Sequence, residues 1–337
     1  MSLAISLSEK GIVPDTLVRW GMRRLISARL SKETLRAEER LAFIKELAHS
    51  PVALVPEKAN EQHYEVPPGF FERTLGKRLK YSSCYWPEGV TTLDAAELES
   101  LKQVAERAGI ANGQRVLELG CGWGSFSLWA AEAYPDAKFT AVSNSAPQRR
   151  FIEGRAEARG LANLRVITVD MNEFAIDETF DRVVSIEMFE HMRNYKTLLS
   201  RIASWLAPGG RLFVHVFSHK HFTYPFEVEG QADWMAKYFF TGGIMPAETL
   251  FDSFQDDLKV VSRWPLSGEH YQKTAEAWLE NLDRRRDEVR EHLLPVYGKE
   301  TEVWIQRWRM FFMACAELFG FEGGDQWGVT HTLFEKP

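Results

Sequence analysis

Apolar residues in the first part of the chain recur among charged ones at helical spacings. Leu17, Trp20 and Leu25 begin this pattern, and Pro67 interrupts it. We therefore predict that residues 1–80 form an N-terminal helical extension. Its first helix is rich in arginine, which is typical either of a solvated helix face or of a helix on a membrane surface. The interspersed acidic residues favour the solvated face.

A further helix is predicted just before the first strand. Thr91 followed by Asp94 has the spacing of a capping box, and Gly109 is the residue type that commonly ends a helix. We therefore expect a helix that is capped by Thr91 and that stops at Gly109.

From residue 112 the pattern changes to short apolar runs that alternate with helical segments. The runs are RVLEL (115–119), KFTAV (138–142), LRVITV (164–169), DRVVSI (181–186) and RLFVHVF (211–217). Strands that alternate with helices predict an α/β fold, in which a mostly parallel sheet carries helices on both of its faces.

The remaining segments complete this picture. Pro208-Gly209-Gly210 predicts a turn before the fifth strand, and amphipathic patterns predict long helices over roughly 272–292 and 300–319. The terminal run VTHTLFEK alternates apolar and polar residues, so we predict an edge strand there.

Composition is that of a globular protein. Of the 337 residues, 45% are hydrophobic and 26% are charged, and the net charge is −6. No dominant basic field is present to bind phosphates, so we do not expect a nucleic-acid partner. The three cysteines, Cys84, Cys121 and Cys315, lie far apart in the sequence. Their sparseness favours a reducing compartment over a disulfide framework.

The N-terminal residues MSLAISLSEKG do not have the basic and apolar segments of a signal peptide. No run approaches the roughly 20 apolar residues that span a bilayer. We therefore expect a cytoplasmic protein with no stable membrane insertion. The sequence leaves the oligomeric state open, a homodimer included.

The most informative segment is a strand that runs into a glycine-rich turn. Gly120, Gly122 and Gly124 follow the strand, and a helix is expected to start near Ser125. Glycines at such a turn let the backbone approach a nucleotide closely. Dinucleotide enzymes use the spacing G-x-G-x-x-G and bind a pyrophosphate, which the acidic Glu118 would repel. The carboxylate suits the cationic amino-acid end of S-adenosylmethionine, so we predict this methyl donor rather than NAD.

Polar residues follow the next two strands. Ser143, Asn144 and Gln148 stand where an acidic residue usually binds ribose hydroxyls, and they can form hydrogen bonds with a nucleoside. Asp170 and Met171 follow the third strand, where a carboxylate can accept a hydrogen bond from the adenine amino group. Three successive strand ends therefore carry groups that suit the donor.

Six short motifs stand out between about residue 60 and the C-terminus. They are His63-Tyr64, Tyr81-Ser82-Ser83-Cys84-Tyr85-Trp86, residues 116–124, Met188-Phe189-Glu190-His191-Met192, Tyr238-Phe239-Phe240 and Leu266-Ser267-Gly268-Glu269-His270-Tyr271. With these motifs the chain resembles the cyclopropane-fatty-acid synthase superfamily of methyltransferases, and within it most closely the coclaurine N-methyltransferases.

This resemblance implies a Rossmann-like class I methyltransferase domain over residues 81–337. The domain would have a mostly parallel seven-stranded sheet and helical insertions at about 220–250 and 272–320. The resemblance also implies that S-adenosylmethionine is contacted by Tyr81, Ser82, Gly120, Ser143, Asn144, Gln148, Asp170, Met171 and Ile186.

The chain departs from the cyclopropane synthases where they bind a bicarbonate base through a cysteine, a glutamate, a histidine and a tyrosine. Glu190 is kept, but Ser83 stands at the cysteine position and Phe311 near the tyrosine position. The histidine corresponds either to Pro265 or to His270. Losing ligands of a buried anion should remove its site, because an unpaired buried charge is very unfavourable.

The fourth strand ends in a second cluster of candidate residues, at the sheet edge where α/β folds bind ligands. The synthases have a small residue where this chain has Glu187, whereas the N-methyltransferases share the glutamate. We hypothesise that Glu187 and Glu190 attract and orient an ammonium and that His191 helps to remove its proton. The alternative is that Glu190 and His191 only tie the strand end to a neighbouring loop. Their place beside the donor favours catalysis.

Aromatic residues recur at helical spacing near the C-terminus. The stripe consists of Trp304, Trp308, Phe311, Cys315 and Phe319. Core packing is the usual meaning of such a stripe, but the resemblance places elements beyond the fourth strand over the acceptor. The predicted acceptor-binding residues are therefore Tyr85, Phe239, Phe240, Phe311 and Trp327. Aromatic faces also attract cations, which suits both a sulfonium and an ammonium.

No metal is predicted. His215, His219 and His221 are close together in sequence, but no cysteine accompanies them and Lys220 lies between two of them.

Three functions are weighed. The first is N-methylation of a small, aromatic, isoquinoline-like amine. The second is modification of an unsaturated phospholipid chain, as in the cyclopropane synthases. The third is donor binding without catalysis, against which the retained Glu187, Glu190 and His191 argue.

Overall fold

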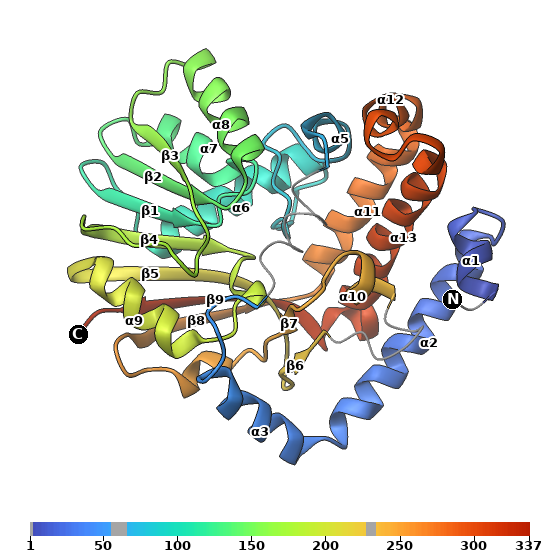
Figure 1. Ribbon diagram of the computed structural model, residues 1–337, viewed down its shortest axis with the longest axis horizontal. Helices are drawn as coiled ribbons and strands as arrows, with labels where there is room; N and C mark the ends of the chain where they lie inside the picture. Colours follow the sequence, from blue (N-terminus) through green and yellow to red (C-terminus); the bar gives the residue numbers. More distant parts are fainter. Residues whose placement is uncertain (1–2, 55–65, 227–233) are drawn as a thin grey trace.

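A computed structural model describes residues 3–54, 66–226 and 234–337. Its centre is a seven-stranded sheet in the order β3-β2-β1-β4-β5-β9-β8 (Figure 1). The strands are β1 (Arg115–Leu119), β2 (Lys138–Ser143), β3 (Leu164–Thr168), β4 (Phe180–Ile186), β5 (Leu206–His219), β8 (Lys259–Leu266) and β9 (Trp327–Glu335). Neighbours among the first five are parallel, and β9 runs antiparallel to β5 and β8. The predicted α/β fold with a mostly parallel seven-stranded sheet is confirmed.

Helices surround the sheet. In chain order they are α1 (Leu3–Glu9), α2 (Asp15–Thr34), α3 (Ala37–Leu47), α5 (Pro68–Thr74), α6 (Leu93–Ala108), α7 (Ser125–Ala133), α8 (Ala146–Ala158), α9 (Tyr195–Trp205), α10 (Trp234–Tyr238), α11 (Glu269–Arg284), α12 (Arg286–Tyr297) and α13 (Thr301–Phe319). Short 3-10 helices are η2 (Phe189–His191), η3 (Leu250–Ser253), η4 (Gly298–Glu300) and η5 (Phe321–Gly324). A small sheet pairs β6 (Tyr224–Pro225) with β7 (Ile244–Met245).

The helix before the first strand confirms the predicted end at Gly109 but not the predicted cap. Gly109 adopts φ 67, and the N-cap is Thr92 rather than Thr91, since the Thr92 hydroxyl accepts the N–H of Ala95. Asp94 is used elsewhere: its carboxylate accepts the N–H of Lys77 at 3.0 Å. A tertiary contact therefore removes the acidic partner of the expected capping box.

The predicted turn at Pro208-Gly209-Gly210 is instead a bulge inside β5. On one side of the bulge Leu206 of β5 pairs with Phe180 of β4, and on the other side Arg211 pairs with Arg182. The β5 strand therefore has more residues than β4 between these two pairs. Gly209 adopts φ 70 there. The positive φ lets the extra residues loop out while both flanks stay paired.

The prediction that the C-terminal strand forms an edge is wrong. β9 pairs on one side with β5 and on the other with β8, which is the edge strand. The sequence of β8, KVVSRWPL, has only a weak apolar pattern. This agrees with its position, since its side chains are mostly half-buried or exposed. It also contains Pro265, which lacks an N–H and is tolerated at an edge.

The first of the two predicted C-terminal helices is divided. The backbone of Arg285 leaves the helical region at φ −110 and ψ 27, which separates α11 from α12. The second predicted helix is present as α13. Figure 1 shows α11, α12 and α13 together on one side of the sheet, with the long α2 running past α13.

Ion pairs fasten α2 to these C-terminal helices. Arg19 contacts Glu276 of α11 at 2.6 Å and Glu317 of α13 at 3.0 Å. Arg309 of α13 contacts Asp15 at the start of α2 at 2.6 Å. Among the helices of the described residues, none is long and apolar enough to cross a membrane.

The helices α11 and α13 pack around tryptophans that are closed off from solvent. Trp308 is 0% exposed and its ring contacts Phe70, Phe239 and Phe312. This part of the predicted aromatic stripe therefore forms core, which was the usual meaning of its spacing.

We expect Trp308→Ala to lower the free energy of unfolding by about 3–5 kcal/mol, because it leaves a large cavity in a packed core. Denaturant unfolding followed by circular dichroism measures the change. Trp20→Ala is the matched control, since Trp20 on α2 is 54% exposed, and it should change stability by less than about 0.5 kcal/mol. Equal losses in the two variants would contradict the assignment of Trp308 to the core.

Candidate active site

Two adjoining cavities open at the carboxyl ends of the parallel strands. Cavity A is lined by Val142, Ser143, Asn144, Gln148, Asp170, Met171, Met188 and His191, among others. Cavity B is lined by Lys80, Tyr81, Ser82, Glu118, Trp123, Ile186 and Glu187, among others. Both are bounded by Gly120, Gly122 and Gln148. The structure thus brings together every residue predicted to contact the donor except Gly124.

The glycine turn between the cavities has a conformation that other residues rarely adopt. Gly120 has φ 79, and an added Cβ would come within 2.6 Å of Met188 Cγ. Gly122 has φ 50 and faces open space. Gly124 lines neither cavity, and its missing side chain serves packing, because a Cβ would come within 2.7 Å of Ile152. Two of the three glycines therefore shape the cavities, and the third lets α7 pack closely.

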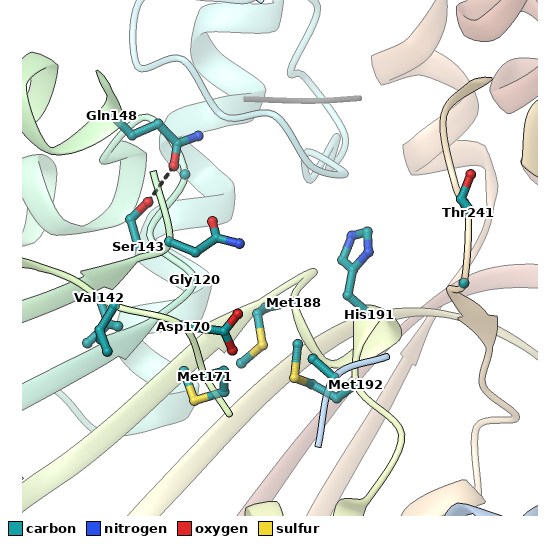
Figure 2. Close-up of a pocket in the computed structure, with 15 residues that line it drawn as sticks. Gly120, Val142, Ser143, Gln148, Asp170, Met171, Met188, His191, Met192 and Thr241 are labelled. Carbon is teal, nitrogen blue, oxygen red and sulfur yellow. Dashed lines mark hydrogen bonds between the residues drawn. The ribbon is translucent and has the colours of Figure 1, made fainter. Parts of the chain in front are cut away.

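Several buried polar atoms in these walls have no hydrogen-bond partner within the described residues. They include Gln148 Nε2, Trp123 Nε1 and Ser125 Oγ. The Ser143 hydroxyl does have a partner, because it donates to Gln148 Oε1 at 2.7 Å. In Figure 2 this pair, with Asp170 and Met171, lies on one side of cavity A, and His191 lies on the other with Met188 between. Buried polar atoms without partners are rare, so these atoms indicate that the cavities bind a polar ligand.

Glu118 is a buried carboxyl group on β1. Its carboxylate accepts a hydrogen bond from the hydroxyl of Ser127. Burial raises the pKa of Glu118 to about 7, against the opposing effect of that hydrogen bond. A cation next to this group would favour its ionised form.

Glu187 follows β4 directly and is held by several elements at once. Its Oε1 accepts the N–H of Ser83 at 2.9 Å and contacts His215 Nε2 at 3.2 Å. The Tyr271 hydroxyl donates to its Oε2 at 2.8 Å. Burial raises the pKa of Glu187, while the nearby Lys80 charge and the hydrogen bonds from Ser83 and Tyr271 oppose the rise. Its φ of 47 is uncommon outside glycine, and such conformations cluster at functional sites.

Glu190 has a divided role. Its Oε1 accepts the N–H of Phe217 at 2.8 Å, which ties η2 to β5 as the structural alternative proposed. Its buried Oε2 has no partner among the described residues. Burial and the neighbouring Glu187 charge raise the pKa of Glu190 well above its ordinary value. Of the two carboxyl groups, Glu190 therefore has the more strongly raised pKa.

His191 faces cavity A from η2. Its ring stacks on Phe240 with centroids 4.8 Å apart. Burial lowers the pKa of His191 to about 4, although Glu187 opposes the shift. The imidazole is therefore neutral at physiological pH and has a nitrogen that can accept a proton.

The other predicted acceptor-binding residues are spread over several elements. Phe239 stacks on Phe311 with centroids 4.3 Å apart, so this pair joins the residue after α10 to α13. Tyr85 lies beside the His270 ring at 4.9 Å. Trp327 donates from Nε1 to the Tyr224 hydroxyl at 2.9 Å. Phe240 stacks on the ring of His191, a predicted catalytic residue. The acceptor roles of all five stay predictions.

Three residues of the site were missed by sequence reasoning. Lys80 is 2% exposed and donates to the Ser82 hydroxyl at 2.6 Å and to the Ser83 carbonyl. Tyr271 and His215 both contact Glu187. Lys80 immediately precedes one recognised motif and Tyr271 ends another, which was the available signal. His215 was considered only as a metal ligand.

The histidines His215 and His219, which are close together in sequence, have partners other than a metal. His215 contacts Glu187, and His219 Nδ1 accepts the N–H groups of His221 and Phe222. Within the three described stretches of the chain, no group of three or more histidine, cysteine or acidic side chains could hold a metal ion.

Comparison with known proteins identifies the family. A model of the mycolic acid cyclopropane synthetase family matches residues 55–327. The chain belongs to this family. The motif His63-Tyr64, part of the recognised resemblance, lies outside the described residues.

Individual members of the family match nearly the whole chain. The (S)-coclaurine N-methyltransferase of Thalictrum flavum subsp. glaucum is 38% identical, covering 97% of this chain and 94% of that protein. The (S)-coclaurine N-methyltransferase of Papaver somniferum is 37% identical, covering 97% and 96%. A crystal structure of coclaurine N-methyltransferase bound to N-methylheliamine and SAH superposes with a TM-score of 0.93 at 38% identity, covering 99% of each chain. These matches confirm the predicted family, fold, enzyme class and methyl donor.

The cavities fit S-adenosylmethionine. The glycine turn makes room that a Cβ at Gly120 would fill, and Gln148 Nε2 and Ser125 Oγ offer buried polar atoms without partners in the described structure. Asp170 lines cavity A, where the nucleoside is expected, and Glu118 lines cavity B, where the cationic amino-acid end is expected.

Donor binding should release a proton and weaken at low pH. With its pKa raised to about 7, Glu118 becomes protonated as the pH falls below that value, whereas a cationic donor needs the carboxylate. The dissociation constant should therefore rise below pH about 7, by at most about tenfold per unit. Titration calorimetry in two buffers of different ionisation enthalpy measures both effects.

Glu118→Gln should abolish the proton release. Glu132→Gln, on the exposed side of α7, is the control and should leave it unchanged. Proton-independent binding by the unaltered protein would show that the donor's ammonium does not contact Glu118.

Proposed function

We propose that this protein is an N-methyltransferase that transfers the methyl group of S-adenosylmethionine to a small, aromatic, isoquinoline-like amine. The observation that carries the proposal is the Glu187 carboxylate, buried at the end of β4 beside the donor cavities. The relatives at 37–38% identity are named (S)-coclaurine N-methyltransferases, which supports an amine acceptor.

An anionic base is disfavoured in this site. Bicarbonate would face the Glu187 charge, and Ser83, at the synthase cysteine position, already gives its N–H to Glu187. Phe311, near the synthase tyrosine position, stacks on Phe239. His270 Nδ1 accepts the N–H of Trp86 at 3.1 Å. Cys84 offers no thiolate in its place, because burial raises its pKa.

In the proposed reaction Glu187, Glu190 and His191 have different charges and different roles. Glu187, the ionised member of the carboxyl pair, orients the acceptor ammonium. Glu190, held by Phe217 and protonated, limits the negative charge in the site. Neutral His191 receives the proton that the nitrogen must lose.

When bound, S-adenosylmethionine supplies a methyl group on a sulfonium, which the acceptor nitrogen takes while the carbon–sulfur electron pair returns to sulfur. The chain contributes mainly by holding the two reactants in contact, an effect worth up to about 7–11 kcal/mol. Phe240, stacked on His191, offers an aromatic face next to the reacting cations.

Turnover should depend on these side chains to different degrees. We expect Glu187→Gln and His191→Ala to lower kcat by about 10²–10⁴-fold, the usual contribution of a positioned base or charge. Glu190→Gln should lower kcat by less than about tenfold, because an amide then replaces a carboxyl group that is already neutral. Donor binding by calorimetry is the control for folding. Wild-type turnover in all three variants would refute the assignment.

A substrate panel separates the proposed activity from the alternatives. Tetrahydroisoquinoline amines should be methylated, and vesicles of unsaturated phospholipid should not be. Cyclopropanated or methylated lipid would establish the synthase alternative instead, and donor binding without product from either panel would establish a non-catalytic protein.

We also propose that the protein works in the cytoplasm, in support of which Cys84, Cys121 and Cys315 are buried and unpaired with one another. A homodimer stays a prediction, which sedimentation equilibrium tests directly.

A further inference from the structure

A line of hydrogen bonds runs from Glu187 away from the cavities, through residues that the proposed reaction does not use. Glu187 Oε1 lies 3.2 Å from His215 Nε2, and His215 Nδ1 lies 2.9 Å from His331 Nε2. His331 Nδ1 lies 2.7 Å from Arg107 Nη1. Both histidines are 2% exposed, and Arg107 is half-buried. Four side chains from four elements are therefore joined in one row.

The register of the sheet explains this row. His215 on β5 stands directly opposite His331 on β9, which in turn stands opposite Trp264 on β8. The Arg107 guanidinium, carried by α6, lies 5.0 Å from the centre of the Trp264 ring. At the other end, the N–H of Glu187 donates to the His215 carbonyl at 2.8 Å. Backbone pairing thus fixes the Glu187 end of the row, whereas the Arg107 end is held by the side-chain contact with Trp264.

Chemistry fixes the direction of each hydrogen bond. A guanidinium only donates, so His331 Nδ1 must accept from Arg107. A neutral His331 then carries its proton on Nε2 and donates to His215 Nδ1. By the same logic, His215 carries its proton on Nε2 and donates to Glu187 Oε1.

Both histidines fit these neutral forms. Burial lowers the pKa of His215 and of His331 well below the ordinary value, and the cations Lys80 and Arg107 act in the same direction. Each imidazole therefore has one donor and one acceptor nitrogen, as the row requires.

We propose that Arg107, His331 and His215 are positioning residues that orient the Glu187 carboxylate and hold it as a hydrogen-bond acceptor in the acceptor site. Every N–H in the row points toward Glu187, and Arg107 does not give up its proton. The row therefore stabilises the ionised carboxylate and provides no outward path for the proton of the amine. What Glu187 does to the acceptor rests on the function proposed above, whereas the direction of the row does not.

Nitrogen-15 NMR of the full-length protein with labelled histidine tests the direction without any turnover. For His215 and His331 we expect an unprotonated Nδ1 and a protonated Nε2. Arg107→Met removes the donor at the end of the row and should change the His331 signals toward a mixture of tautomers. Arg107→Lys, which keeps a donor, should restore them at least in part.

Arg182→Met is the matched control. Arg182 is also half-buried, but it donates to the carbonyls of Gly109 and Asp181 and does not touch the row. Its removal should leave both histidine tautomers unchanged. Protonated Nδ1 atoms in the unaltered protein, or identical histidine signals in the Arg107→Met variant, would overturn the inference.

Kinetics with a tetrahydroisoquinoline amine tests the effect on Glu187. Arg107→Met should lower kcat about tenfold, the weight of one hydrogen bond to a charged group, with donor affinity unchanged. Arg182→Met should retain kcat. An unchanged kcat in Arg107→Met, with its tautomers altered, would overturn the positioning role. An active Glu187→Gln variant would instead refute the proposed function and leave the NMR result standing.

Discussion

The proposed reaction depends on keeping the Glu187 carboxylate ionised although it has been removed from water. Burial alone would make Glu187 neutral, since a charge in a low-dielectric interior is strongly disfavoured. The structure compensates with donors from separate parts of the chain: the N–H of Ser83, the Tyr271 hydroxyl and His215, with the Lys80 charge nearby. Because each donor comes from a different element, these compensating contacts come together only when the whole domain is folded.

This requirement explains the distribution of charge around the site. Two adjacent buried carboxylates would repel each other, and this repulsion together with burial raises the pKa of Glu190, whose Oε1 also holds η2 against β5. His191 is neutral because burial disfavours its cation. In the proposed reaction Glu187 supplies a negative charge, Glu190 a neutral acid and His191 a neutral base, a combination suited to a cationic acceptor that must lose a proton.

Sequence reasoning predicted the parts that depend on neighbouring residues. The alternating runs gave the α/β fold, and the glycine turn with Ser143, Gln148 and Asp170 gave the walls of the donor cavities. Errors occurred where a distant segment changed a local preference. The Asp94 carboxylate accepts the N–H of the distant Lys77, and the helix is capped by Thr92 rather than Thr91. The weakly patterned β8 pairs outside β9 and turns an expected edge into an interior strand.

By itself, the sequence determined the fold class, the family and the strand ends that carry the chemistry, because periodicity and motif spacing are local properties of the chain. Tertiary structure alone decided which carboxyl group has the more strongly raised pKa, which glycine serves packing and which histidines contact each other. His215 and His331 are 116 positions apart, and only the pairing of β5 with β9 makes them neighbours. Charge states likewise depend on burial and on partners brought from remote segments, which no single stretch of sequence contains.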